Sequence, residues 1–146
     1  MKKFLTLFSV LLSVSSLNAR VIYLVPNDWK SDNAALFVHS WGSGSDIAGQ
    51  MTKVTENLYQ YEIGDNTNCL FVRQSPDLGT TINWEKKWNQ TADLTLSGSN
   101  SHYTIKANTW DNGGGTWAVV HLETSVVTKV PTCTETGLED IVCSAC

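Results

Sequence analysis

The sequence is poor in charge and lacks the motifs by which common enzymes are recognised. Only 16% of its 146 residues are charged, and 14 acidic side chains outnumber 10 basic ones, which gives a formal net charge of −4. Nucleic-acid binding requires a concentrated basic surface, so the composition argues against it. The sequence contains no H-E-x-x-H pair, no phosphate-binding loop and no G-x-S-x-G elbow. We therefore expect a protein that is not an enzyme, binds no nucleic acid and uses no cofactor.

Sustained helical periodicity is also missing between residues 21 and 121. Short β-rich runs recur there at the spacing typical of a sandwich or barrel, separated by turn-forming Gly, Asn, Asp and Ser residues. The runs are 21–25, 34–40, 58–63, 69–73, 93–96, 102–105 and 117–120. With 42% hydrophobic residues, the chain can bury a core, and its length suits one compact domain. We predict an all-β fold, an antiparallel immunoglobulin-like β-sandwich over residues 20–121.

Residues 1–19 have the features of a secretory signal peptide. Lys2 and Lys3 precede an apolar run over 4–14, and Ala19 is a small residue at the expected cleavage point. Serines at 13, 15 and 16 interrupt this run before it reaches the roughly 20 residues needed to span a bilayer. We therefore expect a secreted, extracellular or cell-surface protein without membrane insertion. Loss of the two lysines would change its formal charge to 8 − 14 = −6.

Residues 122–146 contain no aromatic side chain but hold three of the four cysteines, Cys133, Cys143 and Cys146. In an exported chain, disulfides are the first interpretation, and four cysteines allow three complete pairings among which the sequence does not choose. The spacing of Cys143 and Cys146 also suits zinc, but a convincing fourth ligand is lacking, since His121 is distant. We expect no metal site. We expect a separable Cys-containing tail or truncated repeat that lacks the strand content of the body.

Period-2 alternation divides the side chains of residues 34–41 between two faces. Leu36 and Val38 share one face, whereas Phe37, His39 and Trp41 share the other. If the aliphatic face points inward, the aromatic face forms an outward row, which Tyr23 of the first run joins. The rings would then stand about 7 Å apart, a spacing suited to an extended ligand. The opposite interpretation, in which the aromatics form the core, stays open at this point.

The segment 83–91 places Trp84 and Trp88 around three charged residues. The two tryptophans either cap one end of the sandwich or contact a ligand directly. The segment ends in the sequon Asn89-Gln90-Thr91, so Asn89 is a candidate site of N-glycosylation.

Several segments together resemble the starch-binding carbohydrate-binding modules of family 26 and its relatives. The segments are YLVPNDW at 23–29, LFVHSW at 36–41, GQM at 49–51, LYQYEI at 58–63, LFVRQSP at 70–76, NWEKKWNQTADLTL at 83–96 and TWDNGGGTW at 109–117. They span about 21–120, nearly the whole expected domain, and their order is more specific than any one of them. The tail resembles a short cysteine repeat of modular cell-surface proteins.

The resemblance implies non-catalytic binding of α-glucan chains of the starch or glycogen type. The positions that match the stacking and contact residues of the family are Tyr23, His39 and Trp41. The matching segments add Trp29, Arg73 and Trp84 to the expected carbohydrate-binding residues. A cell-surface or enzyme partner is compatible with this function.

One departure from the family supports a second hypothesis. Related modules often have Trp-Pro-Gly before the Met, whereas this chain has Ile47-Ala48-Gly49-Gln50-Met51. An isoleucine side chain does not stack on a sugar ring as an indole does. The alternative function is a cell-surface structural or adhesion domain without glucan binding.

Overall fold

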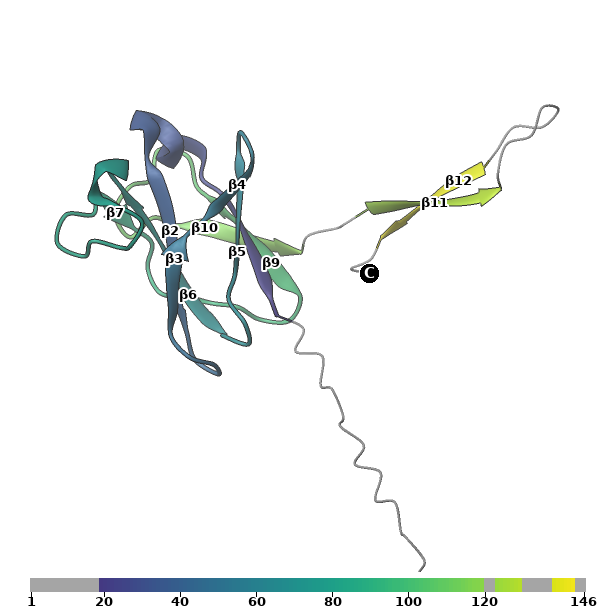
Figure 1. Ribbon diagram of the computed structural model, residues 1–146, viewed down its shortest axis with the longest axis horizontal. Helices are drawn as coiled ribbons and strands as arrows, with labels where there is room; N and C mark the ends of the chain where they lie inside the picture. Colours follow the sequence, from purple (N-terminus) through teal and green to yellow (C-terminus); the bar gives the residue numbers. More distant parts are fainter. Residues whose placement is uncertain (1–18, 120–122, 130–137, 144–146) are drawn as a thin grey trace, which may run out of the picture.

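The computed structural model describes residues 19–119, 123–129 and 138–143, with side chains for residues 19–119. The chain is all-β, as predicted, and residues 19–119 form two five-stranded sheets (Figure 1). The first sheet, sheet A, contains β1 (Val21–Val25), β4 (Thr52–Thr55), β5 (Leu58–Glu62), β9 (Asn100–Ile105) and β10 (Gly115–Val119). Sheet B contains β2 (Ala35–Trp41), β3 (Ile47–Gln50), β6 (Asn68–Gln74), β7 (Asn89–Gln90) and β8 (Leu94–Thr95). Two short 3-10 helices, η1 (Asn27–Asn33) and η2 (Pro76–Leu78), lie in connections.

The strand order is β10-β9-β1-β5-β4 in sheet A and β3-β2-β6-β7 in sheet B, where β8 also pairs with β6. Strands β1 and β9 run parallel, whereas the other pairs are antiparallel. The expectation of a purely antiparallel fold is therefore wrong at this one pair. A parallel pair requires a long crossover, and here all of sheet B lies between β1 and β9 in the sequence.

The inner faces of the two sheets share one apolar core. Alternate residues of β1, Ile22 and Leu24, are completely buried, and Leu36 and Val38 of β2 meet them from sheet B. Burial of a side chain of this size stabilises a fold by about 1.5–3 kcal/mol. The remaining buried members of this core are Trp29, Met51, Ile63, Cys69, Phe71, Leu96, Tyr103 and Ile105.

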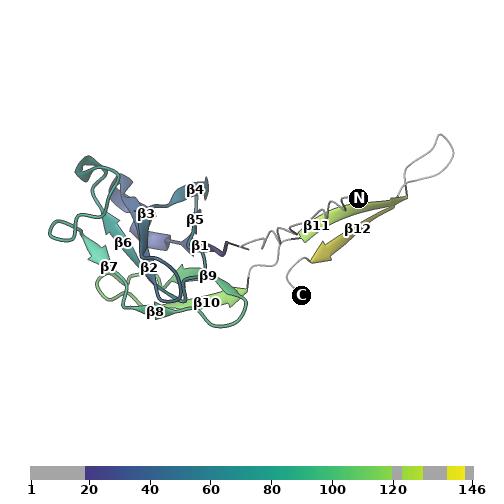
Figure 2. The ribbon, with the colours of Figure 1, turned by 60° about the horizontal axis from the view of Figure 1, so that its bottom comes forward.

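The tail contains strands, contrary to the expectation. β11 (Glu123–Lys129) and β12 (Leu138–Cys143) pair antiparallel in a two-stranded sheet that shares no strand with sheets A and B, and both views draw it apart from them (Figures 1 and 2). The side chains of Cys133, Cys143 and Cys146, and with them the expected disulfides, lie outside the described residues. The expected signal peptide also lies outside them, apart from Ala19. In the described part of the chain, no helix has the length and apolar character to cross a membrane.

Candidate functional site

Strand β2 presents its aromatic residues on the outer face of sheet B. Leu36 and Val38 belong to the shared core, so the interpretation in which the aliphatic face points inward is confirmed. Phe37 is on the outer side but is completely buried, within a small cluster of outer side chains. Ala35, Phe37, Leu70 and Val72 form this small outer cluster, against which Trp41 and Ile82 pack. Phe37 is therefore not available to a ligand.

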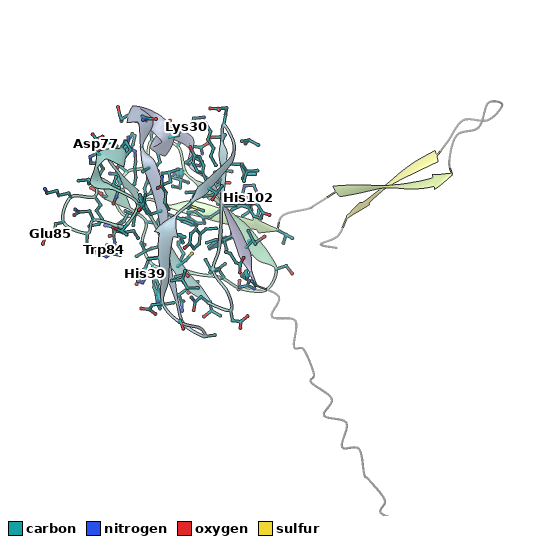
Figure 3. All side chains as sticks on the ribbon, viewed as in Figure 1. Lys30, His39, Asp77, Trp84, Glu85 and His102 are labelled. Atoms are coloured by element: carbon teal, nitrogen blue, oxygen red, sulfur yellow. The ribbon has the colours of Figure 1, made fainter. Side chains whose placement is uncertain are left out.

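Three rings meet beside this covered cluster and form what we call the face cluster: His39, Trp41 and Trp84. The ring centroids of His39 and Trp41 are 5.1 Å apart at an interplanar angle of 34°. Trp84 meets the His39 ring edge-on, with centroids 5.6 Å apart. Figure 3 shows His39 and Trp84 on the same side of the molecule, Trp84 on the loop before β7. The Trp84 residue is 46% exposed and the His39 side chain 27%.

Gln74 holds the loop that carries Trp84. Its side chain is completely buried at the end of β6; its Nε2 donates to the Thr81 carbonyl, and its Oε1 accepts from the Asn83 N–H, both at 2.9 Å. A short turn follows, in which the Lys87 N–H donates to the Asn83 carbonyl at 2.9 Å. Because the buried Gln74 amide is hydrogen-bonded at both its nitrogen and its oxygen, a rearrangement of the loop would break both bonds. Trp84 is therefore held in place beside His39.

The turn after Trp41 is held in a similar way. The buried Asn66 side chain donates from Nδ2 to the Ser45 carbonyl at 2.9 Å and to Ser40 Oγ at 3.2 Å, and its Oδ1 accepts from the Gly44 N–H at 3.0 Å. Gly42 has φ +123°, and a Cβ there would come within 2.6 Å of Thr67 Oγ1. These hydrogen bonds hold the glycine turn beside Trp41 in one conformation.

Polar side chains flank the face cluster. Asp46 Oδ2 lies 3.8 Å from His39 Nε2, and the Asp46 side chain is 76% exposed. Asn68 pairs with Trp41 across β2 and β6, so both side chains lie on the same face of sheet B. Asn68 Oδ1 accepts from Thr95 Oγ1 at 3.2 Å. The rings are therefore bordered by a carboxylate, an amide and a hydroxyl, groups that exchange hydrogen bonds with ligand hydroxyls.

Tyr23 does not join this cluster, which corrects the expected outward row. It lies on β1 of sheet A, opposite Gln60 on one side and His102 on the other. Figure 3 shows His102 on the side of the molecule away from His39 and Trp84. Alternation within a strand predicts its two faces but not the sheet to which the strand belongs, so the row was assembled from two different sheets.

Trp29 and Arg73 are interior residues, and their expected contact with carbohydrate is wrong. Trp29 is completely buried, and its Nε1 donates to the Thr109 carbonyl at 2.8 Å. Arg73 is 5% exposed, and its Nε, Nη1 and Nη2 donate to Trp29 O, Asn89 Oδ1, Ser31 O, Ser31 Oγ and Asp32 Oδ2. All three guanidinium nitrogens are already engaged within the protein. Arg73 therefore links η1 to sheet B and is not a ligand contact.

Asn89 is 9% exposed, and both atoms of its amide are engaged. Its Oδ1 accepts from Arg73 at 3.2 Å, and its Nδ2 donates to Asp111 Oδ1 at 3.3 Å. Because a glycan would be attached to that same Nδ2, the folded structure argues against Asn89 as a glycosylation site.

Two exposed tryptophans were not predicted as contact residues. Trp88 is 38% and Trp110 is 42% exposed, and both rings lie against the Arg73 guanidinium. Trp88 was considered, with Trp84, as either a cap or a ligand contact but not included among the expected carbohydrate-binding residues, and Trp110 sits in a glycine-rich turn without a strand pattern. The count of six tryptophans in one small domain was the available signal, since some of them had to face outward.

The remaining features of the described residues do not compete with these surfaces. No group of three or more His, Cys, Asp or Glu side chains in the described part is arranged to hold a metal ion. A shallow hollow of about 390 Å³ lies at sheet A, lined by Val21, Thr52, Gln60, Tyr61 and Glu62, and it contains no ring pair. Compared with known proteins, the chain matches no family, no curated protein and no solved structure.

Proposed function

We propose that this protein is a secreted, non-catalytic carbohydrate-binding module that binds an α-glucan chain on the outer face of sheet B. The observation that carries the proposal is the face cluster, two indole rings joined through His39 at centroid distances of 5.1 and 5.6 Å. The resemblance to family 26 modules supports it at His39, Trp41 and Trp84. An immunoglobulin-like sandwich is the fold we assign to it.

The chemistry of a sugar chain suits this surface. A pyranose ring packs its axial C–H bonds on an aromatic face, and its hydroxyls require hydrogen-bond partners such as Asp46 and Asn68. A few ring contacts of about 1 kcal/mol each, with hydrogen bonds of similar net value, correspond to dissociation constants of roughly µM to mM. The Trp84 residue is 46% exposed and the His39 side chain 27%, so part of each ring is accessible to a polymer that crosses this face.

The adhesion hypothesis depended on Ile47 in place of a tryptophan and on the cysteine tail. Ile47 pairs with Ser40, which is completely buried, whereas Ala48 pairs with His39. By this register, the Ile47 side chain belongs to the opposite face of sheet B from the face cluster. The substitution therefore leaves the three rings of the proposed site unaltered, so Ile47 does not argue against binding at this face.

Affinity electrophoresis against amylopectin, glycogen, xylan and a β-glucan tests the proposal. We expect retardation by amylopectin and glycogen, and we expect Trp84→Ala to weaken it by roughly 5- to 150-fold, the value of about 1–3 kcal/mol that stacking contributes to bases on aromatic side chains. Tyr23→Ala is the matched control, because it removes an aromatic ring from sheet A. No retardation of the wild-type protein by any of the four polymers would contradict the proposal and favour the adhesion domain.

Trp84 is a better probe than Trp41. Trp41 is partly buried and packs against the outer cluster around Phe37, so Trp41→Ala reduces stability as well as binding. The Trp84 residue is 46% exposed. Its removal affects mainly the ligand, and an unchanged melting temperature separates loss of contact from loss of fold.

A further inference from the structure

Two further exposed tryptophans lie against one guanidinium, and we call these three residues the end cluster: Trp88, Trp110 and Arg73. Arg73 has the same parity along β6 as the core residues Cys69 and Phe71, so it points between the sheets rather than onto the outer face. It reaches Trp29 and Ser31 of η1. The end cluster therefore covers one end of the space between the sheets, where η1, β6 and the β9–β10 connection meet.

The guanidinium fixes the two indole rings. Arg73 Cζ lies 4.6 Å from the centroid of the Trp88 ring and 5.2 Å from that of Trp110. A cation held by five hydrogen bonds and placed against both rings restricts their side-chain rotation. Each tryptophan is nevertheless more than a third exposed. Rings that are immobile before binding lose little conformational entropy when a ligand covers them.

The backbone around Trp110 is fixed as well. The Asn108 N–H donates to Asp28 Oδ2 at 2.6 Å, and Thr109 O accepts from Trp29 Nε1. Among the described residues, every non-glycine residue with positive φ lies in the two segments that frame the end cluster: Asn27, Asp32, Asn33, Asn108 and Asn112. Asn and Asp adopt this left-handed conformation more readily than other non-glycine residues, and here they shape the two segments beside the end cluster.

The charges at the rim indicate what kind of ligand fits. Every guanidinium nitrogen of Arg73 is already bonded inside the protein, and its charge is paired with Asp32 at 2.6 Å. The side chain of Asp32 is 71% exposed, and Asp111, which accepts from Asn89, is exposed as well. Arg73 balances the charge of Asp32, so Asp111 leaves one net negative charge among these three groups, and both carboxylates can accept hydrogen bonds from hydroxyl groups. Flat apolar rings bordered by hydroxyl acceptors match an uncharged sugar.

We infer that the end cluster is a second binding site for a neutral glycan, separate from the face cluster. This inference rests on the proposed function, since both sites take the same class of ligand. Two sites on one molecule can engage one long polysaccharide together, and such linkage raises avidity about 10²- to 10⁴-fold over a single site. The affinity for a polymer should therefore exceed that for a short oligosaccharide by a similar factor.

The indole N–H signals of the six tryptophans provide a test in the intact protein. Each signal is assigned by a Trp→Phe variant, and the protein is titrated with maltoheptaose, xylohexaose and cellohexaose in ¹H–¹⁵N NMR spectra. We expect one of these neutral sugars to shift the Trp88 and Trp110 signals as well as those of Trp41 and Trp84. Trp117, which packs against Phe71 and Tyr103 of the shared core, is the internal control that stays unshifted.

The possible patterns separate the two proposals. Shifts at Trp41 and Trp84 alone would overturn the second site and leave the proposed function intact. Shifts at Trp88 and Trp110 alone would support the second site and overturn the face cluster, whereas no shift with any sugar would overturn both. A larger response to oligogalacturonate would overturn the requirement for a neutral ligand. Shifts of Trp88 and Trp110 on raising the protein concentration without sugar would show self-association instead, and would also overturn the inference.

Discussion

Replacement of Arg73 by methionine is the strongest single test of how this structure is held together. Arg73→Met keeps the length of the side chain and removes all five hydrogen bonds. The two that are fully buried leave Trp29 O and Asn89 Oδ1 without their donor. A buried acceptor left unpaired costs about 1–3 kcal/mol, so the pair costs about 2–6 kcal/mol. Asp32 adds little, because its carboxylate is 71% exposed and water solvates it again.

A loss of this size is a large part of the 5–15 kcal/mol by which a small domain is stable. It should lower the melting temperature of the full chain by roughly 10 °C or more, measured by circular dichroism. Arg20→Met is the matched control, because Arg20 donates one exposed hydrogen bond, from Nη2 to the Gly98 carbonyl. We expect the control to change stability by less than about 1 kcal/mol. Equal melting temperatures for the two variants would refute the role assigned to Arg73.

The acid side of the stability curve gives a second readout of the same variant. Hydrogen bonds from Ser31 and then Arg73 hold the pKa of Asp32 below its ordinary value of 3.8. A carboxylate with a lowered pKa contributes stability that is complete above its ordinary pKa and is lost as the pH falls through the lowered value. Arg73→Met should therefore reduce the dependence of the unfolding free energy on pH below about 4. An unchanged acid dependence would show that Asp32 and Arg73 are not coupled.

Three further predictions concern other parts of the fold. A Cβ at Gly49 would lie 2.7 Å from Tyr61 Cζ of the facing sheet, so Gly49→Ala should lower the free energy of unfolding in urea by about 1–3 kcal/mol. A Cβ at Gly114 would have no atom within 4 Å, so Gly114→Ala should not cause this loss. Burial lowers the pKa of His102, whose buried Nε2 has no hydrogen-bond partner. The unfolded chain then binds more protons than the folded chain, so the free energy of unfolding should fall as the pH drops below about 6.5, and less so in His102→Gln. Burial raises the pKa of the Cys69 thiol to about 12, so iodoacetamide at pH 8 should label Cys69 only after denaturation. Peptide mass spectrometry measures the labelling, and rapid labelling of the native protein would contradict the burial of Cys69.

The sequence predicted those strands whose buried face leaves a pattern. β1, β2 and β6 alternate or are continuously apolar, and all three were located to within a residue or two. β4 was missed because all four of its residues are exposed, so that no face of it differs from a loop. β7 has two residues and β3 contains an alanine and a glycine, which leaves too few large side chains for a period to emerge. Such strands are ordered by their neighbours and not by their own sequence.

The site was predictable where it depends on one strand. Alternation in β2 correctly placed His39 and Trp41 on one outward side. The proximity of Trp84 depends on a loop that Gln74 fixes across nine residues, and no local pattern encodes that contact. Arg73 is instructive, because the parity of β6 aligns it with the core residue Phe71, yet a charged side chain is ordinarily assigned to the surface.

The exposure of the loop tryptophans argues for binding rather than for a structural cap. A cap stabilises a fold by burying its rings, at about 25 cal/mol for each Å² of apolar surface removed from water. Trp84, Trp88 and Trp110 are instead 46%, 38% and 42% exposed, and they are three of the four large hydrophobic residues exposed in the described side chains. Successive residues of β6 point to opposite sides, so Gln74 holds the loop beneath Trp84 while Arg73 holds Trp88. The fold thus orders this short loop through contacts from both sides of β6 and still leaves part of the Trp84 and Trp88 rings in water, where a ligand can cover them.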